Sequence, residues 1–139
     1  MDKQTNAIKT LLIAATLIIF SFTNANAQSG IIGHPIKIGR LMIAERYFQY
    51  RMNWFDAKDA CAKLGKGWRL PTLEELRLMC DKRDEIGRYA EGFFWTCDSP
   101  SLGSGHMYVI QFIGGGDGYC AWQFAARNSR QYVRAVRTF

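Results

Sequence analysis

The chain has 139 residues, a formal net charge of +6 at pH 7 and 48% hydrophobic residues. Its length suits one ordinary domain that can bury a core without staples, rather than several domains. The positive charge would fit a nucleic-acid partner, but the N-terminal segment argues against that class.

Residues 1–27 have the pattern of a signal peptide. A weakly basic start precedes the uninterrupted apolar run Leu11–Phe22, and Ala25 and Ala27 fit the small-residue pattern of a cleavage site. The apolar run is shorter than the about 20 residues that a bilayer-spanning helix needs. We therefore predict cleavage of this signal peptide, a loose arm over residues 28–35, and no transmembrane segment in the exported chain.

An exported basic chain fits its own set of partners. We expect an anionic glycan, a cell-envelope component or an acidic protein, and no nucleic acid. Solubility alone is the other explanation of the same charge.

The sequence after the arm predicts a strand and then a helix. Residues Ile36–Ala44 are rich in β-branched and long apolar side chains and lack helix caps. Asn53 is a good N-cap with Asp56 three residues later, and Gly65 can end the helix in a left-handed conformation. The apolar side chains recur at helical spacing and form a face of Trp54, Ala57, Cys61 and Leu64.

A second helix follows a stretch that contains several turn and cap signals. Trp68 and Leu70 can bury large apolar surfaces, and Pro71 suits a position just ahead of a helix. Thr72 and Glu75 form a T-x-x-E capping box. The apolar side of this helix consists of Leu73, Leu76, Met79 and Cys80. Each feature has a structural reason, so we interpret the segment as scaffold.

The second half of the chain predicts antiparallel strands. Residues 93–98 form one strand, and residues 107–113 and 119–124 form a hairpin around the Gly-rich turn Gly114–Gly118. Residues 131–139 close the chain. The order of a strand, two helices and several antiparallel strands indicates an α+β fold.

The tail allows two interpretations. Arg127, Arg130, Arg134 and Arg137 are spaced like a basic helical face, which would suit an acidic surface. The β-branched and aromatic content of residues 131–139 favours a strand instead.

All four cysteines lie in the predicted exported chain, at Cys61, Cys80, Cys97 and Cys120. An even number in an exported protein predicts up to two disulfides, and the pairing is open. No CxxC unit is present, so a zinc ribbon is a poor fit. We favour Cys97–Cys120 because both lie in the strand-rich half, and Cys61–Cys80 between the two helices is the alternative.

Three motifs give the chain a family resemblance. The stretch NWFDAKDACAKLGKGWRLPTLEEL from residue 53, FFWTCDS from residue 93 and the terminal YVRAVRTF resemble the Lcl C-terminal domain family, exported bacterial domains of unknown function. The resemblance covers residues 36–139. It implies a C-type-lectin-like fold, in which two helices flank a mixed, mainly antiparallel sheet core and the first and last strands pair. It also implies the periplasm or the cell surface of a bacterium.

The chain departs from this family pattern at two places. The family's Y-W-S-S strand is replaced by Phe94-Trp95-Thr96-Cys97. Ala135 stands where many relatives have a cysteine that would pair with the helix position held here by Cys61. The resemblance therefore implies that Cys61 lacks its usual partner.

The sequence contains no convincing catalytic or metal-binding set. Sugar-binding C-type lectins build a calcium site from E-P-N or Q-P-D with W-N-D, and none of these strings occurs; Asp98 and Asp117 are isolated acids. The same fold hosts an oxidase with a cysteine pair, but Cys61 and Cys80 fall on apolar helix faces. We therefore predict no catalytic residue, no cofactor and no metal.

The motif residues are interpreted as structural. Arg69 with Glu75, and Arg134 with Arg137, are expected to form ion pairs with partly buried carboxylates. The residues given this structural role are Trp54, Trp68, Arg69, Pro71, Thr72, Glu75, Trp95, Arg134 and Arg137.

Aromatic and basic residues gather in and after the final hairpin. Tyr, Trp and Arg are the types enriched at binding hot spots. The candidate ligand-binding residues are Tyr108, Tyr119, Trp122, Arg127, Asn128 and Arg130. Core packing is the alternative for Trp122, and a solvated loop is the alternative for the last three.

The sequence thus predicts an exported, non-catalytic and calcium-independent binding or adhesion module for an envelope or extracellular ligand. A cysteine-dependent oxidoreductase on the same fold and a subunit of a surface appendage are the alternatives.

Overall fold

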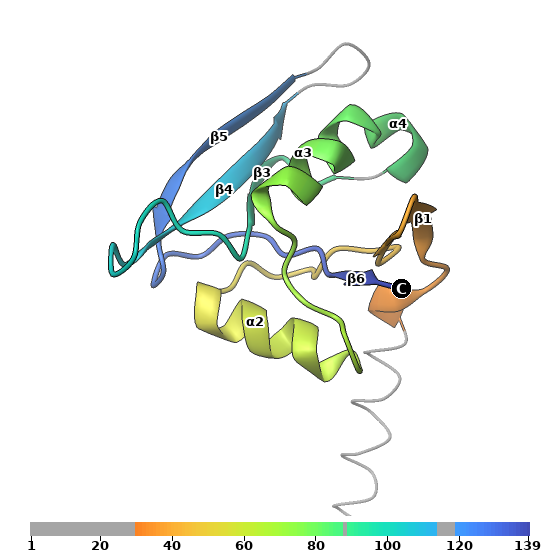
Figure 1. Ribbon diagram of the computed structural model, residues 1–139, viewed down its shortest axis with the longest axis horizontal. Helices are drawn as coiled ribbons and strands as arrows, with labels where there is room; N and C mark the ends of the chain where they lie inside the picture. Colours follow the sequence, from red (N-terminus) through yellow and green to blue (C-terminus); the bar gives the residue numbers. More distant parts are fainter. Residues whose placement is uncertain (1–29, 88, 114–118) are drawn as a thin grey trace, which may run out of the picture. The chain divides into compact units, whose positions relative to one another are not determined.

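The computed structural model describes residues 30–87, 89–113 and 119–139, and Figure 1 shows how the elements of this part are arranged. They form two three-stranded sheets and three named helices. The chain has the predicted α+β architecture with antiparallel sheets.

The first sheet joins the start of the described chain to its end. Strands β1 (Ile36–Ile38), β2 (Leu41–Ile43) and β6 (Val136–Thr138) are antiparallel in the order β1-β2-β6. The single strand predicted over residues 36–44 is wrong, because the chain turns at Gly39, whose φ is 57°. Glycine adopts this left-handed conformation without the cost that a Cβ would bring. The second strand of the resulting hairpin pairs with the last strand.

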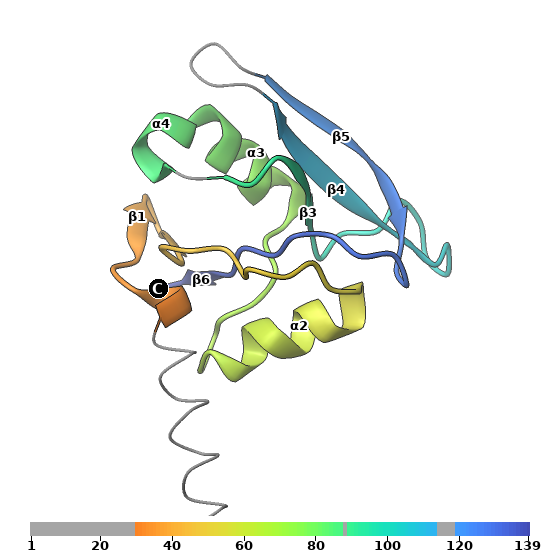
Figure 2. The ribbon, with the colours of Figure 1, turned by 180° about the vertical axis from the view of Figure 1, so that it is seen from behind.

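The second sheet contains β3 (Gly92–Trp95), β4 (His106–Ile113) and β5 (Tyr119–Ala126) in the order β3-β4-β5. The predicted hairpin is confirmed, with His106 opposite Ala126 and Ile113 opposite Tyr119. Its predicted turn, Gly114–Gly118, lies outside the described residues. Figure 2 shows β5 along the outer edge of this sheet, with β4 inside it.

Helix α2 (Trp54–Lys63) and helix α3 (Leu73–Asp81) lie where the sequence predicts them, and a short helix α4 (Arg83–Ile86) follows. Asn53 caps α2 by accepting from the backbone N–H of Asp56. Thr72 and Glu75 form the predicted capping box of α3. The predicted inner faces are confirmed, since their buried members are Ala57, Cys61, Leu64, Leu76, Met79 and Cys80.

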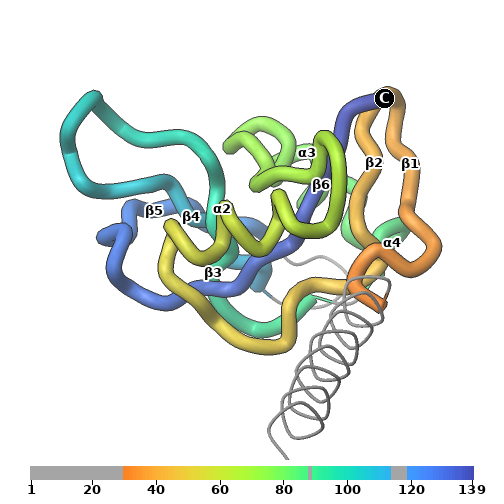
Figure 3. The backbone as a smooth tube through the Cα atoms, turned by 90° about the horizontal axis from the view of Figure 1, so that it is seen from below, coloured from red at the N-terminus to blue at the C-terminus, as the bar shows by residue number. Residues whose placement is uncertain are grey.

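The C-terminal segment is extended rather than helical, and it runs between the two sheets. Tyr132 accepts a backbone hydrogen bond from Trp95 and donates one to Phe93, and Gln131 exchanges two with Met52. The strand interpretation of the tail is therefore confirmed over Val136–Thr138, whereas Gln131 and Tyr132 form isolated bridges and residues 133–135 lie outside the strands. The segment covers the outer edge of β3, and the tail lies beside β2 in Figure 3.

The core has two clusters of buried side chains. One gathers α2, Trp68 and Trp95 with the Met107 side of β4, and includes both Cys61 and Ala135. The other gathers α3 and Phe94 with the Ile110 side of β4. The second sheet thus separates the two clusters, because side chains alternate between its faces.

The arm predicted to be loose is held over its described part. Residues 30–32 are helical. The carbonyls of Ile31 and Ile32 accept backbone hydrogen bonds from Arg46 and Glu45, and both isoleucines pack against the first core cluster.

Candidate functional site

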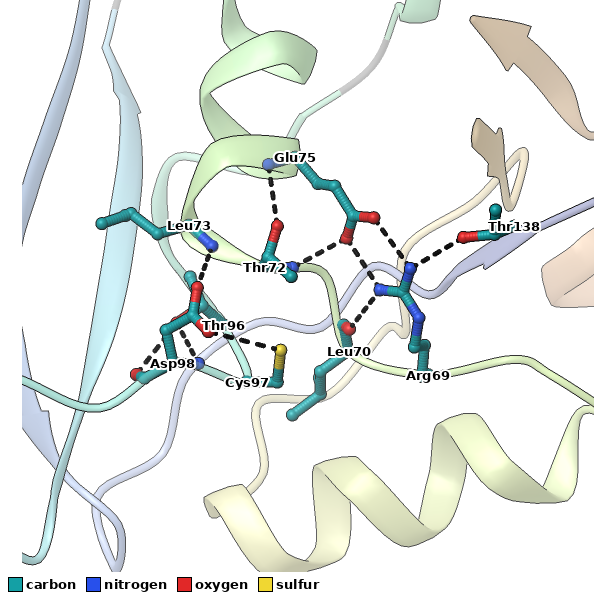
Figure 4. A network of polar contacts seen from close by, with 9 residues as sticks. All are labelled: Arg69, Leu70, Thr72, Leu73, Glu75, Thr96, Cys97, Asp98 and Thr138. Carbon is teal, nitrogen blue, oxygen red and sulfur yellow. Dashed lines mark hydrogen bonds and ion pairs between the residues drawn. The ribbon is translucent and has the colours of Figure 1, made fainter. Parts of the chain in front are cut away.

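The motif between the two main helices is a closed network of polar contacts, shown in Figure 4. The Arg69 guanidinium forms a bidentate pair with Glu75, at 2.7 Å from Nη1 to Oε2 and 2.8 Å from Nη2 to Oε1. Glu75 also accepts the N–H of Thr72, and Arg69 donates to Thr138 on β6. The predicted Arg69–Glu75 ion pair is confirmed, and it ties α3 to the last strand.

The contacts of Glu75 with Arg69 and Thr72 shift the pKa of its carboxyl. Burial raises the pKa of its carboxyl, but the hydrogen bonds and charge of Arg69 and the N–H of Thr72 outweigh burial and leave the pKa below its ordinary value. Glu75 is therefore a satisfied structural carboxylate at neutral pH, with no proton to exchange with a substrate.

Asp98 serves the same helix from the other side. Its Oδ2 accepts the N–H of Leu73 at 2.6 Å, at the start of α3 (Figure 4). Thr96, which is fully buried, donates to the carbonyl of Tyr108. An acid that sequence alone leaves isolated is thus part of a helix cap, where the positive end of the dipole favours it.

Arg134 and Arg137 depart from the predicted ion pairs. Arg134 is fully buried and donates to the backbone carbonyls of Ala44, Glu45 and Gly87. Arg137 lies over the Trp68 ring, 5.6 Å from its centroid, and forms no ion pair within the described chain. Among the described residues, Arg134 thus donates to carbonyl oxygens and Arg137 lies on an aromatic face.

Close packing beside Arg137 explains one glycine of the motif. Gly67 has a φ of 84°, and a Cβ there would lie 3.1 Å from the Arg137 side chain. Trp68 itself is only 6% exposed and Pro71 is buried. These positions are occupied by packing, as the scaffold interpretation predicts.

Trp95 and Trp54 hold the same core together by their indole N–H groups. Trp95 is fully buried and donates to the carbonyl of Met52, and Trp54 donates to the carbonyl of Thr96. The Trp54 ring is partly exposed, with Lys58 and Arg127 over it at 4.7 and 5.1 Å from the centroid.

The predicted Cys97–Cys120 disulfide is wrong. Cys120 on β5 is bonded to Cys80 on α3, with 6.3 Å between the Cα atoms. The prediction relied on strand content alone. Cys80 lies on the face of α3 that packs on the sheet, and this packing brings it within bonding distance of Cys120. Cys97 instead lies after β3, exposed and free.

Cys61 is free and buried, as the loss of its usual partner at Ala135 implies. Burial raises the pKa of the Cys61 thiol to about 12. Burial and the charge of Asp98 raise the pKa of Cys97. A catalytic thiol needs the opposite shift, because the thiolate is the nucleophile.

Three rings on the second sheet form the surface that we call the aromatic face: Tyr108 on β4, and Trp122 and Phe124 on β5. Tyr108 lies 5.7 Å from Trp122 and 5.3 Å from Phe124 between ring centroids, and the last two are 6.0 Å apart. Trp122 is nevertheless 50% exposed and Phe124 51% exposed. The rings are ordered by one another while one side of each stays open.

Strand register explains why these rings meet. Phe124 is opposite Tyr108, and Trp122 is opposite Ile110, so all four side chains share one face of the sheet. Helix α3 packs on this face at Cys120, where Cys80 is bonded, and at Ile110, which is buried, whereas Trp122 and Phe124 stay half exposed. Phe124 is absent from the predicted set, although its spacing of two from Trp122 in a strand was the signal that could have found it.

The other candidate residues lie apart from the aromatic face. Arg127 turns to the α2 side, where its Nε donates to Met107 Sδ at 3.3 Å and its carbonyl accepts the N–H of Trp54. Arg130 donates to the carbonyl of Arg51 through Nε and Nη2. Asn128 is exposed in the turn between them, and Tyr119 is 66% exposed at the far end of β5. The predicted set thus joined two groups that lie apart in the structure, namely aromatic residues of the sheet and arginines that contact neighbouring loops.

A cleft of about 1040 Å³ lies elsewhere, lined in part by Tyr47, Tyr89 and Tyr132. Burial raises the pKa of Tyr89 to about 12, and its hydroxyl has no hydrogen-bond partner among the described residues. None of the candidate residues lines this cleft. Within the described ranges, no group of three or more His, Cys, Asp or Glu is placed to hold a metal ion, and no helix is long and apolar enough to cross a membrane.

Comparison with known proteins identifies the fold. The chain is similar to EMS16, an antagonist of the collagen receptor integrin α2β1, with a TM-score of 0.58 and 12% identity over 76% of this chain and 97% of the other. It is similar to botrocetin, with a TM-score of 0.55 and 13% identity over 76% of this chain and 96% of the other. The chain has a C-type-lectin-like fold. No family model matches its sequence, and no curated protein matches it.

Proposed function

We propose that this chain is an exported, non-catalytic binding module that contacts an envelope or extracellular ligand through the aromatic face. The observation that carries the proposal is the state of Trp122 and Phe124, which are fixed in a ring cluster and yet half exposed. Large aromatic side chains left open on a rigid element are typical of binding hot spots.

Preorganisation supports the proposal. The backbone N–H of Tyr108 donates to the carbonyl of Asp98, and Asp98 in turn caps α3. Residues 106–113 and 119–126 pair without interruption beneath the rings. A ligand would therefore meet rings that have already lost their conformational freedom, which lowers the entropic cost of binding.

The ligand contact that we propose needs no calcium and no thiol chemistry. The Asp98 carboxylate is committed to the start of α3, and the rings of the aromatic face offer no carboxylate oxygens for a cation. The arginines that favoured an anionic ligand are held beside Trp54 and Arg51, so charge at the aromatic face does not select an anion. We propose instead that apolar faces of the ligand, whether glycan or protein, stack on the rings.

The neighbours in fold agree with a binding role. EMS16 is an antagonist of an integrin, and the proposal carries only the general role of recognition from it to this chain. Membership of the Lcl C-terminal domain family, and with it the bacterial periplasm or cell surface, is part of the proposal.

The test is a binding screen of envelope polysaccharides and envelope proteins against three forms of the protein. Trp122→Ala should lose binding, while Phe55→Ala should keep it, because Phe55 is 54% exposed but lies on α2, away from the aromatic face. A chelator should leave binding unchanged. Equal binding by wild type and Trp122→Ala, or loss of binding in chelator, would contradict the proposal.

A further inference from the structure

The open edge of β5 differs from the other strand edges of the described chain. The outer edge of β3 is covered by Tyr132, and β6 exchanges backbone hydrogen bonds with Arg69. The edge strand β1 has three residues, carries Lys37 and follows Pro35. Short length, lysine and proline are the usual protections of an exposed edge.

Strand β5 has none of these protections. It has eight residues, YCAWQFAA, and contains no Lys, Arg, Asp, Glu or Pro. It pairs with β4 at every position, so no bulge twists its edge away. A long and uncharged edge of this kind is a template for another strand.

The backbone groups that face this open edge follow from the ladder. Tyr108 pairs its N–H and C=O with Asp98 and Thr96, on the side away from β5. The N–H and C=O groups of successive residues point to opposite sides of a strand, so those of Met107 and Val109 point toward β5. The backbone groups of their partners, Ala125 and Gln123, point toward β4. The N–H and C=O groups of Cys120, Trp122 and Phe124 therefore face outward.

We propose that β5 pairs with β5 of a second copy of this chain, antiparallel about a two-fold axis at Trp122. Trp122 then lies opposite its own copy, and Phe124 lies opposite Cys120 of the partner. Each such pair exchanges N–H···O=C bonds, which satisfies the outward groups of both chains. The two sheets become one, and the two aromatic faces lie side by side on it.

The lack of charge on β5 makes this edge the place where a second copy can bind. The chain carries a net charge of +6, which opposes self-association over most surfaces. The strand has no charged side chain, so antiparallel copies bring no like charges opposite each other. A two-fold interface also requires one surface to complement itself, and an antiparallel strand does so through its backbone.

The inference does not rest on the proposed function, and its test reads a different quantity. The chain, as recovered from an expressing cell and with Cys97→Ser to prevent bridging by the exposed thiol, is followed by sedimentation over a range of concentrations. We expect a monomer–dimer equilibrium. Tyr108→Ala should keep the dimer, because Tyr108 lies on β4 away from the edge, although the proposed ligand binding should weaken.

Two substitutions examine the edge itself. Trp122→Pro removes the indole and an outward N–H but no N–H that pairs with β4, so pairing with β4 should persist while the dimer is lost. Trp122→Lys places like charges opposite each other and should also give a monomer. Trp122→Ala removes the indole but keeps the outward N–H. Comparison with Trp122→Pro therefore separates the effect of the indole from that of the hydrogen bond.

Amide hydrogen exchange gives the residue-level result. The amides of Cys120, Trp122 and Phe124 should exchange more slowly as concentration rises, while those of Ala121, Gln123 and Ala125 should be slow throughout. A wild-type monomer at every concentration would overturn the proposal. A dimer that persists in Trp122→Pro, or protection of the outward amides only when an added extended peptide is present, would also overturn it.

Discussion

The segment around helices α2 and α3 and the β4–β5 hairpin use aromatic residues in opposite ways. In the first, Trp68 is 6% exposed and covered by Arg137. In the second, Trp122 is 50% exposed although it is in contact with two other rings. Apart from the exposed Phe55, the aromatic residues of 53–80 hold the fold, whereas the hairpin presents apolar surface beyond what the fold requires. The difference shows that composition alone does not separate buried from exposed aromatic residues.

The largest effect is expected at Trp95. Trp95→Ala removes a fully buried indole and its hydrogen bond to Met52, so it should lower the free energy of unfolding by about 3–5 kcal/mol. Phe55→Ala, which removes an exposed ring from α2, should change it by less than about 0.5 kcal/mol. Urea unfolding measures both. Similar values for the two variants would remove the contrast between packed and presented rings.

The disulfide comes next. Replacing both Cys80 and Cys120 by alanine should cost about 2–4 kcal/mol, because the bond joins residues separated by 40 positions and restricts the unfolded chain. Cys97→Ala should cost little, since that thiol is exposed and free. Peptide mapping without reductant would show the Cys80–Cys120 link directly, and a Cys97–Cys120 link would contradict the structure.

A smaller effect is expected at the cap of α3. Thr72→Ala should cost about 1 kcal/mol, because the backbone N–H of Glu75 loses its acceptor. Thr72→Ser keeps a hydroxyl in the same place and should retain most of the stability. Thermal unfolding of the two variants distinguishes loss of the cap from loss of the threonine methyl group.

The smallest effect is a pH dependence. The pKa of Glu75 lies below its ordinary value in the folded chain, so its contribution is present above the unfolded pKa and is lost as pH falls through the folded pKa. Unfolding measured from neutral to acidic pH should show wild type losing its advantage over Glu75→Gln as the carboxyl is protonated. A constant difference across that range would show that the Arg69 pair does not stabilise the fold.

Much of the scaffold could be predicted because its signals are local. Asn53, Thr72 and Glu75 specify helix starts through caps that involve neighbours within a few residues. The turn at Gly39 was missed because apolar residues continue across it, so periodicity does not show the break. A single glycine within a strand pattern was the available sign.

The aromatic face was predicted less well because it depends on how the elements pack in three dimensions. Strand alternation could place Phe124 beside Trp122, but could not show that both rings stay half exposed. The pairing of Cys80 with Cys120 depends on how that helix packs on the sheet. Arg127 and Arg130 resemble free basic residues in sequence, yet Trp54 and Arg51 hold them.

The four tryptophans of the chain provide the most direct test of the account. Their indole N–H signals can be followed separately by NMR while a ligand from the envelope screen is added. The account predicts that the Trp122 signal moves, whereas those of Trp68 and Trp95 stay in place because these rings are packed in the core. A ligand that shifts Trp68 or Trp95 and leaves Trp122 unchanged would contradict the claim that recognition belongs to the aromatic face.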